Sequence, residues 1–212
     1  MAPASGVYNQ CVKRSRKSSL RKIAEARLPT RFGYFRILGL EDARRGSLVA
    51  LVKGKLGGRR APLVRIHSQC LTGDVFGSER CDCRAQLELA LRRIARAGAG
   101  VLLYEPQEGR GIGLMNKLRA YQLQDRGFDT VEANRRLGFP ADRRTYALAA
   151  EALRLLGLRR VRLLSNNPEK VGALERAGVE VAERVPCQPA PARGHRGYLR
   201  VKQRKLGHLL SL

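Results

Sequence analysis

Apolar residues in the first third of the chain recur with the two-residue period that is typical of half-buried strands. Three segments follow this pattern, at residues 34–40, 48–53 and 62–67. Glycine-containing turns separate them, as expected for neighbouring strands. The sequence therefore predicts a small β-rich region at the front of the fold.

The centre of the chain alternates between helical and strand patterns. Five apolar residues between 87 and 95 follow the i, i+3, i+4 spacing of one helix face, and Gly98 ends the pattern. The further expected elements are strand 101–104, helices 114–126 and 143–156, strand 161–164, helix 168–177 and strand 179–182. This alternation predicts an α/β fold (mixed α+β), in which a single domain has a β-rich N-terminal part and alternating strands and helices after it.

Charge is distributed unevenly along the 212 residues. The net charge is +24, which favours an anionic partner such as nucleic acid, an anionic membrane surface or a phosphorylated small molecule. No acidic residue precedes Glu25 or follows Glu183, so the excess lies in two basic ends, which in most proteins are solvated and unspecific. No apolar run approaches the roughly 20 residues that span a membrane. We expect a cytoplasmic protein, although the Ser- and Arg-rich start also resembles an organelle transit peptide.

Three cysteines, Cys70, Cys81 and Cys83, precede the first helical pattern with the spacing C-x10-C-x-C. Three thiolates without an evident fourth ligand are typical of a zinc site with one open position, as in catalytic rather than structural centres. Buried free thiols and disulfides are the alternative interpretations. Cys11 and Cys187 lie in basic, weakly patterned surroundings, and we expect both to be free thiols.

Two connections from strand to helix are candidates for phosphate binding. Residues 105–113 are rich in glycine and lead into a helix N-terminus, which favours negative charge, although a plain tight turn is the alternative. The segment matches neither a Walker A loop nor a dinucleotide fingerprint. In residues 165–170, helix capping explains Asn167 as N-cap and Pro168 as first helical residue. Capping does not explain Ser165 or Lys170.

A third connection, residues 141–146, contains an acid two residues before an arginine. Asp142 is either the N-cap of the following helix or a carboxylate that orients the guanidinium of Arg144 toward an anion. Sequence spacing alone does not decide between these two interpretations.

Together these motifs resemble the GTP cyclohydrolase II family. The resemblance is carried, in order, by the cysteine segment, Glu-Gly-Arg at 108–110, residues 116–121 and 129–134, Asp142-x-Arg144, and Ser-Asn-Asn-Pro-x-Lys at 165–170. It implies a homodimeric enzyme that takes GTP as substrate. The products would be 2,5-diamino-6-hydroxy-4-(5-phosphoribosylamino)pyrimidine, formate and pyrophosphate, in the first committed step of riboflavin biosynthesis.

The resemblance also implies roles for individual residues. Cys70, Cys81 and Cys83 would hold one zinc ion per subunit, and Mg²⁺ would accompany the triphosphate. Arg144 matches the proposed nucleophile of pyrophosphate release and Asp142 its proton acceptor. Tyr121 matches the tyrosine near the reacting ring. The positions that match nucleotide contacts are Arg65, Ile66, His67, Ser68, Gln69, Gln86, Glu108, Gly109, Arg110, Thr130, Ser165 and Lys170.

Three positions depart from the family pattern. Gln69 stands where many relatives carry Glu, Arg84 where Gly is usual, and Ser165 where Thr is common. Ser165 keeps the hydroxyl group, and Gln69 keeps an acceptor but loses a charge. None of these departures removes an expected zinc ligand.

The resemblance divides the chain into a basic, flexible extension at residues 1–22, a catalytic domain at 23–186 and a basic tail at 187–212. Residues 11–31 resemble the linker that follows a dihydroxybutanone phosphate synthase domain in two-domain relatives, so we expect this chain to supply only the GTP-consuming activity. Two rival hypotheses are a zinc-containing nucleic-acid-binding protein and a paralogue with an altered product. We expect nucleic acid to bind only unspecifically, through the basic ends, and no membrane to bind.

Overall fold

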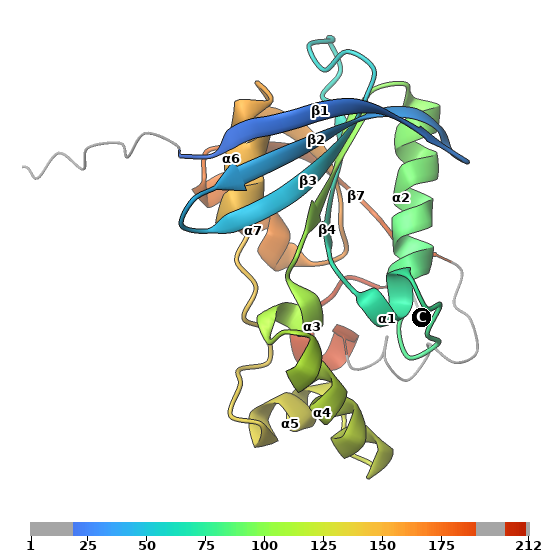
Figure 1. Ribbon diagram of the computed structural model, residues 1–212, viewed down its shortest axis with the longest axis vertical. Coiled ribbons are helices and arrows are strands. Elements are labelled where there is room, and N and C mark those ends of the chain that lie inside the picture. The colour runs from blue at the N-terminus through green and yellow to red at the C-terminus, as the bar shows by residue number, and fades with distance from the viewer. Residues whose placement is uncertain (1–18, 190–201, 211–212) are drawn as a thin grey trace, which may run out of the picture.

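The computed structural model describes residues 19–189 and 202–210, and these form a seven-stranded mixed sheet (Figure 1). The strands are β1 (Arg21–Thr30), β2 (Gly33–Asp42), β3 (Gly46–Lys53), β4 (Leu63–Ser68), β5 (Gly100–Glu105), β6 (Arg160–Leu164) and β7 (Glu180–Val185). Their order in the sheet is β1-β2-β3-β5-β4-β6-β7. Strands β1, β2, β3 and β5 pair antiparallel, whereas β5, β4, β6 and β7 pair parallel.

Helices cover both faces of this sheet. They are α1 (Leu71–Asp74), α2 (Cys83–Ala97), α3 (Glu108–Gly111), α4 (Leu114–Asp125), α5 (Thr130–Arg136), α6 (Ala147–Leu155) and α7 (Pro168–Arg176), followed by a helical turn at residues 202–206. Helix α2 lies on one face and α6 and α7 on the other, whereas α3, α4 and α5 extend below the sheet (Figure 1). No described helix is both long and apolar enough to cross a membrane.

The two faces carry separate hydrophobic cores because successive side chains of a strand point to opposite sides. Leu102 packs with Ile94 and other residues of α2, whereas its neighbours Val101 and Leu103 pack with Leu153 and other residues of α6. Burial on both faces explains the continuous apolar runs of the parallel strands. Strand β5 is fixed between these two cores, and the loop after it is held in place.

The parallel strands β4, β5 and β6 all end at the same edge of the sheet. Each is followed by a connection that the sequence marks for chemistry: residues 69–83, 106–113 and 165–167. In open α/β sheets, ligands bind at this carboxyl edge. The topology therefore brings together three segments that lie far apart in the sequence.

The mixed α/β fold predicted from the sequence is confirmed, and Gly98 ends α2 in a left-handed conformation as expected. The strand β1 was not expected, because residues 21–30 belonged to a linker-like segment. It is an edge strand whose residues are mostly exposed, so it lacks the alternating apolar pattern that reveals a half-buried strand. Helices α1 and α5 were also missed, since four and seven residues are too short for a clear helical period.

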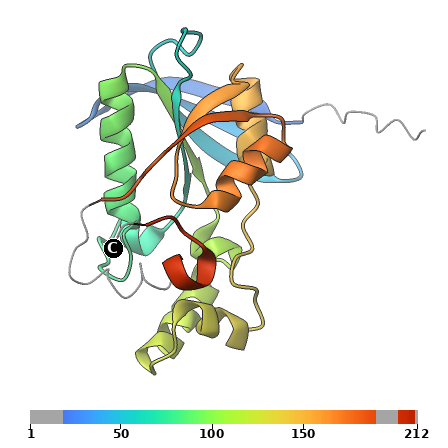
Figure 2. The same cartoon turned by 180° about the vertical axis from the view of Figure 1, so that it is seen from behind.

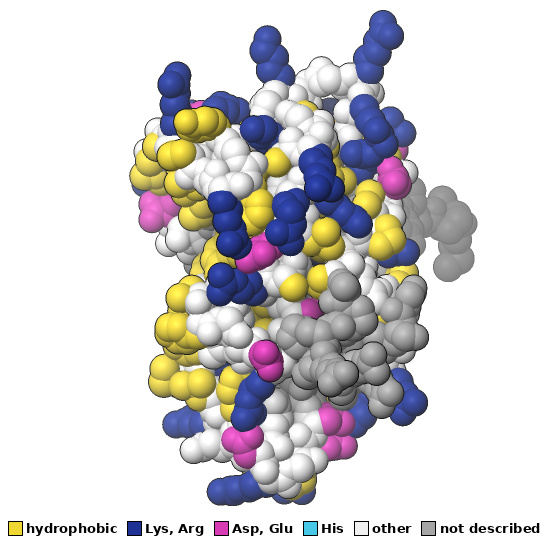
Figure 3. All heavy atoms as spheres, turned by 90° about the vertical axis from the view of Figure 1, so that its right-hand side faces the viewer, with side chains coloured by type: hydrophobic (Ala, Val, Ile, Leu, Met, Phe, Trp, Pro, Cys, Tyr) yellow, Lys and Arg dark blue, Asp and Glu magenta, His cyan; other side chains and the backbone are white. Residues whose placement is uncertain are grey.

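Lys and Arg side chains are spread over the face that includes α2, with few acidic groups between them (Figure 3). On this face they do not form one continuous stripe. Cys11 and most of the predicted N-terminal extension lie outside the described residues. Strand β1 begins at Arg21, so the last two residues of that extension are part of the sheet.

Candidate active site

A pocket lies at the carboxyl edge of β4, β5 and β6, and nearly all of the predicted site residues line it. Those that do are Arg65, His67, Ser68, Gln69, Cys70, Cys81, Cys83, Gln86, Glu108, Gly109, Arg110, Tyr121, Thr130, Arg144, Ser165 and Lys170. Ile66 and Asp142 are not among the described residues that line it. Ile66 is fully buried, and its carbonyl oxygen accepts a hydrogen bond from Lys170 Nζ at 2.7 Å.

The three cysteines form a cluster at one side of this pocket. Cys70 precedes α1 and Cys83 begins α2, and the Sγ atoms of Cys70, Cys81 and Cys83 all lie within 4.8 Å of one another. Gly73 leaves room for the three thiols, because a Cβ atom at this position would lie only 2.8 Å from Cys81 Sγ. None of the described cysteines forms a disulfide. Three convergent thiols in a partly buried cradle fit a thiophilic metal such as zinc.

Lys117 connects the cysteine cluster with Glu108, and sequence reasoning gave it no role. Its Nζ atom lies 3.1 Å from Cys70 Sγ, 2.8 Å from Thr72 Oγ1 and 2.7 Å from Glu108 Oε1. Glu108 also accepts a hydrogen bond from the backbone N–H of Leu71 at 2.7 Å. Hydrogen bonds from Cys81 and Cys83, together with the charge of Lys117, lower the pKa of the Cys70 thiol well below its usual range. The site therefore favours at least one thiolate.

Tyr121 lies one helical turn after Lys117 on α4, so both side chains point to the same side. Its hydroxyl group lies 3.1 Å from Thr72 Oγ1, and the guanidinium of Arg80 lies 4.7 Å from its ring centre. Burial raises the pKa of Tyr121, so the phenol keeps its proton at neutral pH. The shared face of Lys117 and Tyr121 is the signal that could have revealed Lys117 in the sequence.

Asp74 supports the metal side of the pocket from behind. Its Oδ2 atom accepts hydrogen bonds from the backbone N–H of Cys70 and from the hydroxyl of Tyr104, both at 3.0 Å. His67 Nε2 lies 3.1 Å from the same carboxylate, and its ring stacks on Tyr104. Burial lowers the pKa of His67, so its imidazole is neutral near pH 7. His67 thus contributes to the wall of the pocket rather than a positive charge.

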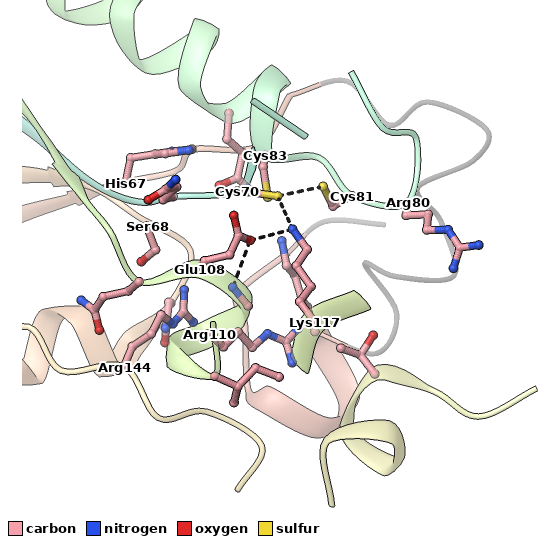
Figure 4. Close-up of a pocket in the computed structure, with 18 of the residues that line it drawn as sticks. His67, Ser68, Cys70, Arg80, Cys81, Cys83, Glu108, Arg110, Lys117 and Arg144 are labelled. Carbon is pink, nitrogen blue, oxygen red and sulfur yellow. Dashed lines mark hydrogen bonds and ion pairs between the residues drawn. The ribbon is translucent and has the colours of Figure 1, made fainter. Parts of the chain in front are cut away.

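The turn at α3 brings a strained backbone to the opposite side of the pocket. Gly109 and Arg110 both have φ of 62°, and Arg110 is the non-glycine residue with positive φ in the described part of the chain. Such strain is common at functional sites. Figure 4 shows Glu108 between the cysteine cluster and the side chains of Arg110 and Arg144. The pocket therefore has a thiol side and a cationic side.

Asp142 and Arg144 form a local pair, and Asp142 does not cap a helix. Helix α6 begins at Ala147, four residues later than predicted, with Tyr146 as its N-cap residue. Asp142 Oδ1 instead accepts hydrogen bonds from the backbone N–H and from Nε of Arg144, both at 3.0 Å. Burial opposes ionisation of Asp142, but these contacts with Arg144 lower its pKa below the usual value. The carboxylate thus orients a guanidinium that lines the pocket.

Gln107 holds this pair in place, and it too was missed. Its side-chain amide donates to Thr145 O at 2.7 Å and accepts from Thr145 N at 2.9 Å, in the manner of a neighbouring strand. Nε2 of Gln107 also lies 2.9 Å from an oxygen of Glu105, which is 1% exposed. Burial raises the pKa of Glu105 to about 7.

Ser165 lies in the connection between β6 and α7, and Lys170 lies in the first turn of α7. Asn167 caps α7 and Pro168 is its first residue, as predicted. Lys170 is 4% exposed, and burial together with the charges of Arg65 and Arg144 lowers its pKa well below the usual range. An anion in the pocket would favour the protonated amine again.

The C-terminal residues 202–210 also reach this pocket, which differs from the solvated tail that their charge suggested. Lys202 and His208 line it. Lys202 is buried and its Nζ atom lies 2.7 Å from Oδ1 of Asp82, the residue between Cys81 and Cys83. These partners are 120 residues apart in sequence, so local pattern could not reveal them.

Known proteins with sequences similar to this chain are named for riboflavin biosynthesis. The chain is 53% identical to the riboflavin biosynthesis protein RibBA of Bacillus cereus, over 94% of this chain and 51% of that protein. The RibBA proteins of Bacillus cytotoxicus and Bacillus mycoides are each 52% identical, with the same coverage. The chain thus spans about half the length of these curated relatives. RibBX of A. baumannii, a two-domain 3,4-dihydroxy-2-butanone 4-phosphate synthase, is only distantly similar, with 17% identity and a TM-score of 0.43 over 71% of this chain and 35% of that one.

The sequence model that matches this chain covers both sides of the pocket. It is described as GTP cyclohydrolase II, and it matches residues 21–186, from the first residue of β1 to the residue after β7. The matched region includes all three clustered cysteines and the turn of Arg110. The chain belongs to the GTP cyclohydrolase II family.

Proposed function

We propose that this chain hydrolyses GTP to 2,5-diamino-6-hydroxy-4-(5-phosphoribosylamino)pyrimidine, formate and pyrophosphate. The observation that carries the proposal is one pocket with two chemically different sides, a cluster of three thiols and a group of cations, in a member of this family. Opening a guanine ring and cleaving a phosphoanhydride need different chemical groups. A single nucleotide that lies across Glu108 would meet both.

Cys70, Cys81 and Cys83 would hold a zinc ion at the thiol side. Bound zinc would supply Lewis-acid polarisation and lower the pKa of a coordinated water. Around it, Asp74 fixes the backbone of Cys70, and Lys117 neutralises the thiolate charge. Tyr121 keeps its proton, so its hydroxyl group can donate a hydrogen bond to the purine or pass a proton to it.

Arg110, Arg144 and Lys170 bind the triphosphate, which Mg²⁺ would accompany. Arg65 Nε and Ser68 Oγ are buried without a hydrogen-bond partner among the described residues, so they are suited to contact the nucleotide. The carboxylate of Asp142 accepts a hydrogen bond from the guanidinium of Arg144. Because the pKa of Asp142 is lowered, its carboxylate is a weak base. We therefore assign Asp142 an orienting role beside its proposed role as proton acceptor for the nucleophile Arg144.

The experiment that tests this proposal incubates zinc-loaded protein with GTP and Mg²⁺ and quantifies formate, pyrophosphate and the pyrimidine. A matched pair of variants isolates the cluster. Cys81→Ser should lose the metal and formate production, whereas Cys187→Ser, which changes a buried thiol outside the cluster, should keep both. Folded, zinc-loaded protein that makes no formate would contradict the proposal.

The proposal includes a homodimer in the cytoplasm and a role in riboflavin biosynthesis, and the names of the RibBA relatives support this role. It also includes unspecific, salt-sensitive binding of nucleic acid through the basic ends. Selective binding of RNA or DNA at physiological salt, together with undetectable formate, would favour the nucleic-acid-binding alternative.

A further inference from the structure

Residues 202–210 are fastened to three different elements around the pocket. Lys202 binds Asp82 at the start of α2, and the backbone N–H of Leu209 donates to Asn166 O at 2.9 Å, in the connection after β6. Lys205 forms ion pairs with Asp129 and Glu132 at the start of α5. Figure 2 shows this short helix, in dark red, between the sheet and the helices α4 and α5. The segment therefore closes one side of the pocket.

Two internal contacts shape the end of this segment. The backbone N–H of His208 donates to Lys202 O at 3.2 Å, and Gln203 Nε2 donates to Leu210 O at 2.9 Å. They fold residues 207–210 back against the helical turn, so His208 faces the pocket while Arg204 stays exposed. The position of His208 is thus fixed by the backbone.

Arg110, Arg144 and Lys170 line the same pocket as His208. Burial lowers the pKa of its imidazole to about 3, with contributions from the charges of Lys202, Arg144, Arg110 and Lys170. Lys202 is paired with Asp82 and Arg144 with Asp142, and Arg110, Arg144 and Lys170 are the cations that we assign to phosphate binding. A neutral imidazole can donate one N–H, and an acceptor-rich anion can accept it while it also binds neighbouring cations of the pocket.

We propose that residues 202–210 are a wall of the nucleotide pocket and that His208 is a further binding residue, which donates a hydrogen bond to the polyphosphate part of the substrate. This inference rests on the proposed function only for the identity of the nucleotide. The anion itself follows from the cations that line the same pocket as the imidazole.

The test separates the polyphosphate from the purine. Binding of inorganic tripolyphosphate and of guanosine to the zinc-loaded full chain is measured by titration calorimetry, for the wild type, His208→Ala, His208→Gln and Arg204→Ala. Loss of one hydrogen bond to a charged group, worth about 1.5 kcal/mol, corresponds to roughly tenfold weaker binding. We expect that loss for tripolyphosphate with His208→Ala, partial recovery with His208→Gln, and less than about twofold change for guanosine.

Arg204→Ala is the matched control, because it removes a full charge from the same segment outside the pocket. It should leave both affinities nearly unchanged. Unchanged tripolyphosphate affinity in His208→Ala, or an equal loss for guanosine, would overturn the inference. Formate production by the wild type is measured beside it: a His208-dependent polyphosphate site without formate would refute the proposed function but not this site.

Discussion

Replacing Gly73 by alanine tests whether the three cysteines form a metal centre, because the added methyl group would enter the cluster directly. The new Cβ would lie 2.8 Å from Cys81 Sγ and 3.1 Å from Cys70 Sγ, whereas ordinary contacts begin at 3.4 Å. One thiol must therefore retreat by about 0.6 Å, well beyond the roughly 0.2 Å tolerance of metal–ligand distances. Alanine gains about 1 kcal/mol of helix propensity, while overpacking costs about 1–3 kcal/mol. Stability should thus fall by no more than about 2 kcal/mol, but metal affinity should fall much further.

The assay compares zinc per chain by elemental analysis, together with urea unfolding, for Gly73→Ala and Gly39→Ala. Gly39 is the matched control, because no atom lies within 4 Å of a Cβ there and its φ is not positive. We expect Gly39→Ala to keep the full metal content and Gly73→Ala to keep less than half. Full zinc content and unchanged resistance to a chelator in Gly73→Ala would refute the reasoning that this cradle holds the metal.

Three further predictions concern buried polar groups. Lys117→Met removes the cation that pairs with Glu108, so the free energy of unfolding should fall by about 3 kcal/mol. The loss caused by Lys117→Met should be smaller when Glu108→Gln is also present, and additive losses in a double-mutant cycle would contradict the coupling of the two residues. Gln107→Leu removes both hydrogen bonds to the backbone of Thr145, the residue after Arg144, so kcat for pyrophosphate release should fall by up to ~100-fold with zinc content unchanged. A wild-type kcat would show that these hydrogen bonds are not needed to position Arg144. Burial raises the pKa of Glu105 from 4.5 to about 7, so the folded protein keeps a proton that the unfolded chain releases, and stability should decrease as pH rises between these values by about 3 kcal/mol at most. Glu105→Gln should remove that slope in denaturant titrations across pH, and an identical slope in the variant would disprove the assignment.

The sequence predicted those elements whose burial leaves a clear period. Strands β2 to β6 and the helices α2 and α7 bury apolar side chains on one or both faces, so apolar spacing reveals them. Strand β1 is exposed along most of its length and pairs only with β2 at the edge of the sheet. Its residues resemble the linker of two-domain relatives, and no apolar period in them indicates a strand instead. Pattern reasoning fails where a strand is stabilised by backbone pairing rather than by burial.

The candidate site was predicted through motifs, whereas its supporting contacts were not. Family resemblance picked out Cys70, Glu108 and Arg144, and the parallel topology explains why they converge. Lys117 and Gln107 reach Cys70 and Thr145, which lie 47 and 38 residues away in the sequence, and only the fold shows these contacts. The basic composition of residues 187–212 predicts a solvated tail, although Lys202, Lys205, Gly207 and His208 resemble the C-terminus of the family. Their distant acidic partners, seen only in the fold, reverse that interpretation.

Glu108 couples the two sides of the pocket, and this decides which thiol substitutions separate the two reactions. Its carboxylate accepts hydrogen bonds from the backbone N–H of Leu71, next to Cys70, and from Lys117 Nζ. Arg110 follows two residues later in the same turn. Cys70 belongs to this network through Lys117, whereas no described contact joins Cys81 to it except through Cys70. Cys81→Ser should therefore stop formate release yet leave some pyrophosphate release, and Cys70→Ser should diminish both. Single-turnover assays that follow both products would show the difference, and equal loss of pyrophosphate in the two variants would mean that the metal, rather than Glu108, links the reactions.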